Sequence, residues 1–282
     1  MSTSETSLNH RAATEDLPLP RSDAVIALED IADGLSRWWI WTAIAWQDIK
    51  LRYRGSILGP FWITLSTAVV ALAMGLIFSR IFHQSMRTYL PYLQTGLVVW
   101  QFVLAIVNEG CQTFLAAASV IRQMPMPFSI QAFRVALRNL IVFAHNFLVL
   151  LIIIWWFRVS IGWSALEFIP GLFVLCINGV WVAVLLGMIS ARFRDIPPIV
   201  GNLIQVLFFV TPIFWSPDQL GPWKSVAEFS PLFAAIDIVR APLIGQPLAP
   251  FSWLIMVVVT LFGCCGTFWF FARFRSRIAY WI

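Results

Sequence analysis

A stretch without charged residues lies between Arg54 and Arg80 and sets the first constraint on the fold. An α-helix crosses the roughly 30 Å hydrocarbon core of a bilayer with about 20 apolar residues, and residues 57–81 are apolar and long enough to do so. Several similar segments follow and occupy most of the chain downstream. The sequence therefore predicts a polytopic membrane protein, whose function depends on what its helices enclose and what its ends contact.

Six such segments are expected as transmembrane helices in an all-α fold, over residues 58–81, 89–115, 135–157, 168–191, 197–215 and 250–271. The composition agrees, because 60% of the residues are hydrophobic and only 12% are charged. A soluble domain carries about twice that share of charge. The spacing of the segments leaves no room for a separate soluble domain, so a single membrane domain is expected over 37–282.

The basic residues predict the orientation of these helices. With both termini in the cytoplasm, the inside segments hold 14 of the 19 Lys and Arg residues and the outside segments hold 5. An excess of basic residues marks the cytoplasmic side. The net charge of +5 reflects the same excess of basic residues on the cytoplasmic side. It indicates contact with anionic lipid rather than with nucleic acid.

The polar N-terminal region and the cysteines carry little functional signal. Residues 1–36 contain eight Ser or Thr and seven acidic residues, and they lack the apolar core of a signal peptide. We expect a mostly disordered cytoplasmic tail there. The four cysteines (Cys111, Cys176, Cys264 and Cys265) all fall in predicted spans without a CxxC pattern, which favours buried small hydrophobes over a disulfide or a metal site.

Nucleotide-binding and catalytic motifs are missing from the sequence. There is no GxxxxGK[ST] phosphate loop, and neither of the two lysines, Lys50 and Lys224, follows a glycine. The chain therefore cannot bind ATP by that route. The three histidines are too scattered for a metal site or a catalytic relay, so no catalytic residue, metal or cofactor is assigned to this chain.

One carboxylate, Glu109, lies inside a predicted span. An intramembrane carboxylate is by default a candidate functional group. The alternative is structural, because Arg134 or Arg138 at the start of the third span could pair with it. A proton-driven carrier would need several such groups, and the sequence does not supply them.

Two segments on the predicted cytoplasmic side have unusual compositions. Residues 37–54 combine several tryptophans with basic residues, which is typical of an amphipathic helix lying in the membrane interface. The alternative is that the tryptophans only form a belt for the first span. The loop 116–128 places small residues and Arg122 before a Pro-x-Pro break, so it forms either a short, stiff docking helix or an ordinary connector.

The predicted outside segment, residues 216–249, is too apolar for a soluble loop and too broken for two spans. Asp237 and Arg240 are three residues apart and hence share one helical face. We expect re-entrant helices, which are tolerated in a membrane only where protein or a cavity covers the backbone.

The aromatic content is high, with 15 Trp, 24 Phe and 4 Tyr. Most of these side chains are expected to pack between helices or face lipid. Aromatic rings can also stack on sugar rings, with little dependence on the sequence of sugar units. Such rings on the first and fifth spans are candidates for a saccharide path: Phe61, Trp62, Phe208, Phe209, Phe214 and Trp215.

From about residue 36 to its end, the chain resembles the membrane subunit of ABC-2-type polysaccharide exporters, in particular O-antigen permeases, with capsule and teichoic-acid permeases as relatives. The segments that carry the resemblance are DIKLRYRGSILGPFWITLS (48–66), YLPYLQTGLVVWQF (89–102), ARFRDIPPIVGNLIQVLFFVTPIFW (191–215) and the terminal RFRSRIAYWI. One departure is Ser230-Pro231-Leu232, where relatives often have Asn-Pro-Leu.

This resemblance implies a homodimer in the bacterial inner membrane, with two copies of a cytoplasmic ATPase that bind ATP and Mg. The implied cargo is a polysaccharide on undecaprenyl diphosphate. The segments 37–54 and 116–127 would dock the ATPase, and helices at about 218–245 would cap the exit. The corresponding residues are Trp46, Lys50, Arg54, Arg122 and Met124 for coupling, and Asp237 and Arg240 for the gate.

Three other functions compete with this interpretation. The chain could export a drug or a small lipid, which the sequence distinguishes poorly. A membrane-embedded glycosyl- or acyltransferase would need an acid pair or a His–Asp arrangement. Asp195 is the only candidate for that role and is better explained as a turn cap. A secondary carrier is disfavoured because intramembrane ionisable groups are few and no internal repeat is detected.

Overall fold

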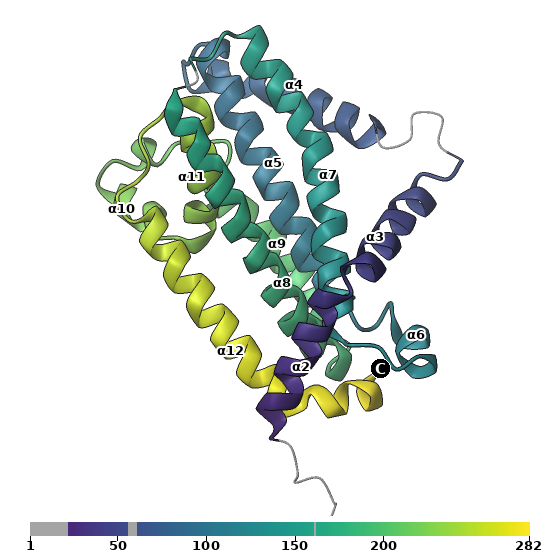
Figure 1. Ribbon diagram of the computed structural model, residues 1–282. Helices are drawn as coiled ribbons and strands as arrows, with labels where there is room; N and C mark the ends of the chain where they lie inside the picture. The colour runs from purple at the N-terminus through teal and green to yellow at the C-terminus, as the bar shows by residue number, and fades with distance from the viewer. Residues whose placement is uncertain (1–21, 56–60, 161) are drawn as a thin grey trace, which may run out of the picture.

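The structure is a computed structural model that describes residues 22–55, 61–160 and 162–282. The described residues form helices without any β-strand (Figure 1). The elements are α2 (Asp23–Ser36), α3 (Trp38–Arg52), α4 (Phe61–Ile81), α5 (Met86–Cys111), α6 (Ala118–Gln123), α7 (Ser129–Trp156), η1 (Trp163–Glu167), α8 (Phe168–Arg192), α9 (Ile196–Val210), η2 (Pro217–Trp223), α10 (Lys224–Glu228), α11 (Pro231–Ile244) and α12 (Ser252–Trp281).

Five of these elements are long and apolar enough to cross a membrane: α4, α5, α7, α8 joined to η1, and α12. The prediction of an all-α polytopic membrane protein is confirmed. The expected span over 197–215 differs, because α9 ends at Val210 after only 15 residues. Thr211 precedes Pro212, and a residue before proline is pushed out of the helical conformation. Residues 211–215 therefore continue α9 without helical structure.

Helix α5 is the centre of the bundle, since 72% of its membrane window is buried, against 22% for α4 and 17% for α12. It packs against α4, α7, α8, α9 and α11. Its buried residues include Leu93, Trp100 and Phe102. A hydrogen-bonded group crosses this core, where the amide of Gln101 on α5 meets Thr67 on α4 at 3.3 Å and accepts from Asn146 on α7 at 2.8 Å. Such bonds hold helices together where packing alone has no hydrophobic driving force.

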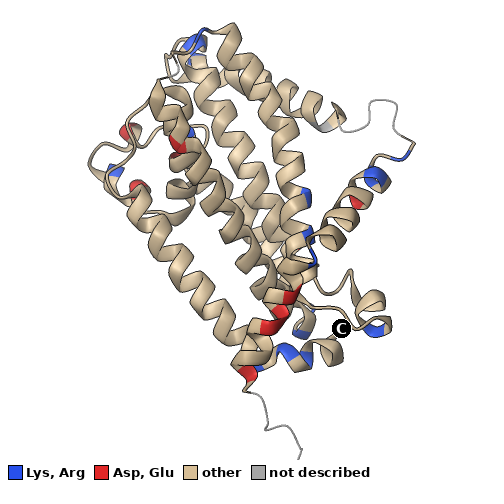
Figure 2. Cartoon of the chain, in the orientation of Figure 1, with Lys and Arg blue, Asp and Glu red and all other residues tan. Residues whose placement is uncertain are grey.

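Most charged residues lie towards the two ends of the bundle, and its middle carries few of them (Figure 2). One end carries α2, α3, α6 and the C-terminus, and we call it the α6 end. The opposite end carries η2, α10 and the start of α12, and we call it the α10 end.

The N-terminal region departs from the expected polar tail over its second part. Residues 1–21 lie outside the described residues, whereas Asp23–Ser36 form α2. The Ser22 side chain accepts a hydrogen bond from the Val25 amide and caps this helix, a role for which serine is preferred. Ala27, Asp30 and Gly34 are buried against the rest of the chain. The helix packs on α7 and α12, and Gly34 lets it approach α7 closely.

Segment 216–249 folds into η2, α10 and α11. Helix α11 is almost completely buried and packs on α5, α8 and α12. It ends at Gly245, whose φ of 68° is a left-handed conformation that glycine adopts without strain. A buried apolar helix of this length between the bundle helices explains why the segment is too hydrophobic for a loop.

Candidate coupling site and exit-side pocket

A chain of alternating charges links α3, α5 and α7 near the α6 end. Asp48 on α3 accepts two hydrogen bonds of 2.6 Å from Arg134 on α7, from Nε and Nη2. Arg138, one turn further along α7, donates from Nη1 to the same carboxylate at 2.7 Å. Planar guanidinium groups that bind carboxylates through two parallel bonds fix both distance and orientation. Helix α3 is thus locked to α7.

Glu109 on α5 extends this chain. Arg138 Nη2 donates to its Oε2 at 2.6 Å, and Asn139 Nδ2 donates to the same oxygen at 2.6 Å. Arg52 on α3 donates to Oε1 at 2.6 Å. The predicted pairing of Glu109 with an α7 arginine is confirmed for Arg138, while Arg134 pairs with Asp48 instead.

This set of five charges, which we call the charge chain, runs in the order Arg134, Asp48, Arg138, Glu109 and Arg52. Its members are between 14% and 40% exposed at the side chain, so most of them are only partly hydrated. Breaking a buried pair by removing one partner is far more costly than the pair itself is stabilising. The charge chain therefore makes α3 a rigid extension of α5 and α7. It contains no arrangement for acid–base catalysis.

A second polar clamp holds α2 against the start of α7. The side chain of Asp30 is fully buried and accepts hydrogen bonds of 3.0 Å from the backbone amides of Phe128 and Ser129. Arg275 on α12 donates from Nε to Asp30 Oδ2 at 2.8 Å, and its Nη2 lies 2.7 Å from the same oxygen in an ion pair. In return, Ser129 Oγ donates to the Asp30 carbonyl at 2.8 Å. These contacts fix the chain where it leaves the Pro125–Pro127 segment and enters α7.

Helix α6 lies beside the C-terminus at the same end (Figure 1). Arg122 Nη2 donates to the backbone carbonyl of Ile282, and Met124 is exposed. On α3, Trp46 and Lys50 are exposed, and the Lys50 ammonium lies 5.7 Å from the Trp46 ring centre. The predicted coupling residues thus stand on one end of the molecule, attached to the bundle through the charge chain and the Asp30 clamp. Arg54, the remaining coupling candidate, is also exposed just after α3.

The predicted gate residues do not pair with one another. Asp237 Oδ2 accepts hydrogen bonds from the Ala249 amide at 2.9 Å and from Ser252 Oγ at 2.6 Å. Arg240 Nη1 donates to the Pro212 carbonyl at 2.9 Å, and its guanidinium lies 4.0 Å from the ring centre of Tyr92. Both side chains belong to buried positions on α11 and anchor the loops on either side of it.

The predicted aromatic path is divided between two places. Phe208 lies within 6 Å of Trp100, Phe209 and Phe214, at 5.8, 5.3 and 5.7 Å between ring centres. Trp215 donates from its indole to the Phe209 carbonyl at 3.1 Å. Phe61 and Trp62 are exposed at the start of α4, and Phe61 lines a separate crevice between α4 and α7. Three of the six rings, those of Phe208, Phe209 and Phe214, therefore form one cluster between α9 and η2, and the Trp215 indole is hydrogen-bonded to its backbone.

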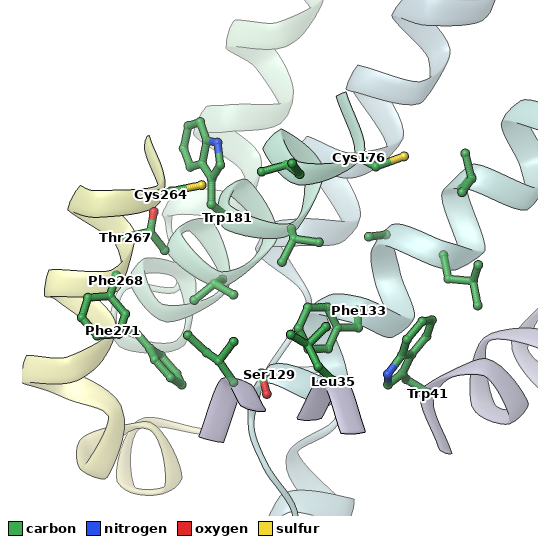
Figure 3. A pocket seen from close by; sticks show the side chains of 17 residues that line it. Leu35, Trp41, Ser129, Phe133, Cys176, Trp181, Cys264, Thr267, Phe268 and Phe271 are labelled. Atoms are coloured by element: carbon green, nitrogen blue, oxygen red, sulfur yellow. The ribbon is translucent and has the colours of Figure 1, made fainter. Parts of the chain in front are cut away.

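Two cavities differ sharply in character. One of about 560 Å³ lies between α2, α3, α7, α8 and α12 and is lined by apolar side chains such as Phe133, Trp181 and Phe271 (Figure 3). This lining suits hydrocarbon rather than a hydrophilic cargo. The other, of about 470 Å³, opens at the α10 end between α5, η2, α10 and α11, and most of its lining residues are polar. We call it the exit-side pocket.

Several residues at these sites escaped the sequence interpretation. Asp48 and Arg52 have the i, i+4 spacing of a helical ion pair, which could have flagged their charged face. Tyr89 and Tyr92 have no comparable signal, because their partners are the Phe214 and Trp215 carbonyls more than 120 positions away. Asp30 could not be distinguished from the other acids of the N-terminal region.

The fold and these sites define a polytopic, all-helical membrane protein whose α3, α5 and α7 are joined by ion pairs near the α6 end. Residues 40–244 match the ABC-2 type transporter family, and the chain belongs to it.

Three relatives are O-antigen export system permease proteins called RfbA. One from Klebsiella pneumoniae is 26% identical over 196 residues, covering 67% of this chain and 74% of the relative. A second from the same species is 24% identical over the same coverage. One from Myxococcus xanthus is 24% identical over 169 residues, covering 60% of this chain and 65% of the relative.

Proposed function

We propose that this chain is the transmembrane subunit of an ATP-driven exporter of O-antigen polysaccharide. The observation that carries the proposal is the family match over residues 40–244 together with relatives that are themselves O-antigen export permeases. ATP hydrolysis belongs to a separate subunit, and the permease supplies the path and the moving helices. The aromatic cluster around Phe208 supports a saccharide cargo, since its ring faces can stack on sugar rings whatever the order of sugar units in the polymer.

The proposed assembly is a homodimer with two ATPase subunits, which bind the ATP and Mg. Large apolar side chains on α4 and α9 are left exposed in the single chain, among them Leu76, Leu203 and Phe209. Contact with a second copy and with lipid would cover them. The proposed cargo is linked to undecaprenyl diphosphate, whose hydrocarbon tail stays in the bilayer.

The proposed topology has six membrane crossings in the bacterial inner membrane and both termini in the cytoplasm. The sixth crossing is α9 completed by residues 211–215. The α6 end is cytoplasmic and the α10 end faces outwards, with η2, α10 and α11 as re-entrant helices over the exit. The charge bias supports this orientation, and burial of α11 meets the requirement that irregular backbone at membrane depth be covered by protein.

Coupling is proposed to occur at the α6 end. Trp46, Lys50, Arg54, Arg122 and Met124 would contact the ATPase, and the charge chain would carry the displacement of α3 into α5 and α7. Ion pairs with two-point geometry transmit a push without the slack of a flexible loop. Asp237 and Arg240 would act at the exit by holding the covering segments in place.

A gene-deletion experiment tests the function. Deletion should remove long-chain polysaccharide from the cell surface and cause lipid-linked polymer to accumulate inside, and the intact chain should restore export. A catalytically inactive ATPase subunit should reproduce the deletion. Unchanged O-antigen on the surface of the deletion strain would contradict the proposal and would favour export of capsule, teichoic acid, a drug or a small lipid.

A further inference from the structure

The exit-side pocket is built on a rigid, buried polar floor. Arg240 is 2% and Asp237 is 6% exposed, and both come from α11. Tyr92 lies over the Arg240 guanidinium and donates from its hydroxyl to the Trp215 carbonyl at 3.0 Å. Tyr89 donates to the Phe214 carbonyl at 2.6 Å. The floor is therefore held together by contacts within the protein itself.

The charges of the pocket are already compensated within the protein. Lys224 lies 2.7 Å from Asp218 and 3.6 Å from Glu228, so this cation serves both rim carboxylates. Asp237 is satisfied by the Ala249 amide and Ser252, and Arg240 by the Pro212 carbonyl and the Tyr92 ring. No cluster that could hold a metal ion occurs among the described residues. An ionic ligand would have to displace these internal pairs.

Uncompensated hydrogen-bonding groups remain at the wall of the pocket. Gln84, Gln219 and Gln246 come from three different segments, and all line the cavity with exposed side chains. None of these three side-chain amides forms a hydrogen bond with another described residue. Each amide offers two donors and an acceptor, the pattern that matches hydroxyl groups. A volume of about 470 Å³ is within the range of small-ligand sites.

The pocket adjoins the aromatic cluster. The two carbonyls held by Tyr89 and Tyr92 belong to Phe214 and Trp215, and the Phe214 ring lies tilted against Phe208 of that cluster, at 5.7 Å between ring centres. A chain of sugar units that leaves the aromatic faces would meet the amide-lined pocket next.

From these observations we propose that the exit-side pocket binds a neutral, hydroxyl-rich saccharide segment of one or two sugar units. This inference rests on the proposed export function and adds a binding site to it. The site gives the emerging polymer a hold on the far side of the membrane, through amide hydrogen bonds that carry no preference for charge.

The experiment measures binding of short neutral oligosaccharides, cut from the host's own surface polysaccharide, to the purified permease–ATPase complex in lipid nanodiscs. We expect the double variant Gln219→Ala/Gln246→Ala to weaken binding about tenfold or more, because two hydrogen bonds of about 1 kcal/mol each are lost and 1.4 kcal/mol is a factor of ten. Gln47→Ala, which removes an exposed amide at the opposite end, should bind as the wild type does.

The outcomes separate this inference from the proposed function. Absent binding by the wild type, or equal binding by the double variant, overturns the inference while normal export in cells leaves the function standing. Preference for inorganic phosphate or for glycerol phosphate over the sugars overturns the neutral-saccharide assignment. Unchanged surface polysaccharide after gene deletion overturns the function and with it the inference. Weakened binding together with unaltered thermal stability supports the site, because the variant is then folded.

Discussion

Asp48 and Arg134 are joined by two hydrogen bonds of 2.6 Å, which set helix α3 against helix α7 in one orientation. The same carboxylate is shared with Arg138, which also binds Glu109 on α5. One set of ion pairs therefore joins α3 to both α5 and α7.

Replacing Asp48 with Asn should uncouple α3 from α7. The loss of the carboxylate charge leaves Arg134 without its ion-pair partner and leaves Arg138 with Glu109 alone, in a partly buried place, at a cost of about 1–3 kcal/mol. We expect ATPase activity of the complex to persist while export of polysaccharide falls several-fold. The measurements are hydrolysis rate and surface polymer at equal membrane abundance. Gln47→Ala serves as the neighbouring control, and full export by Asp48→Asn would refute the transmitting role.

Asp30→Ala should release α2 from the bundle. Two backbone amides and the Arg275 guanidinium lose their acceptor, which removes about 2–3 kcal/mol from the docking of α2. Hydrogen exchange in the peptide 23–36 should accelerate strongly. Asp33→Ala, an exposed substitution on the same helix, should leave exchange unchanged. Equal protection in both variants would show that apolar contacts alone hold α2.

Reversal of the Arg122 charge by Arg122→Glu should weaken co-purification of the ATPase subunit and abolish surface polysaccharide. The residue is exposed on α6, and a guanidinium there can pair with a carboxylate of the partner. Because Arg122 also holds the Ile282 carbonyl, Arg122→Lys is included to preserve the charge. Arg194→Glu makes the same charge change elsewhere at this end. Normal association in Arg122→Glu would assign docking to α3 alone.

The Asp218–Lys224 pair should make the η2–α10 segment sensitive to strong acid. The hydrogen bond from Lys224 lowers the pKa of Asp218, so its stabilising effect is complete above the ordinary value of 3.8 and is lost as the pH falls through the lowered pKa. The effect is small because Asp218 is 73% exposed. A spin label at Ser225→Cys should gain mobility only below about pH 3.8. Asp218→Asn should show the mobile spectrum at pH 7 as well, and pH-independent mobility in the parent would contradict the prediction.

The two ends of the bundle should label from opposite sides of the membrane. Gln123 and Ser225 are both exposed, on α6 and α10. In a background without the four native cysteines, an impermeant thiol reagent on intact cells should modify Ser225→Cys and spare Gln123→Cys until the membrane is opened. Equal labelling of both sites in intact cells would exclude the proposed six-crossing orientation.

The membrane class, the helical fold and the arginine partnership of Glu109 were predictable from sequence, because apolar length and charge inside a span are local properties. Helix α4 and helix α8 coincide with their predicted spans to within a few residues, and the start of α11 follows directly from Ser230-Pro231. Proline at the first helical position is a reliable local start signal.

Contacts between distant segments were beyond such reasoning. Asp30 meets Arg275 across 245 positions, and Tyr89 finds a carbonyl 125 positions away. Asp237 and Arg240 share a helix, as expected. They do not pair with each other, because each binds a different loop. A sequence pattern reports which face a residue occupies, while the identity of the neighbour depends on how the helices are assembled.

Residues 212–215 are held through their backbone. Three side chains donate hydrogen bonds to its carbonyl oxygens: Tyr89 to Phe214, Tyr92 to Trp215 and Arg240 to Pro212. A carbonyl is the same whichever side chain it accompanies. Substitutions can therefore change the side chains of this stretch and adapt its rings to a different cargo. The three residues that donate hydrogen bonds to its backbone must be kept. The aromatic side chains of the exporter can thus vary at these positions while the position of their backbone stays fixed.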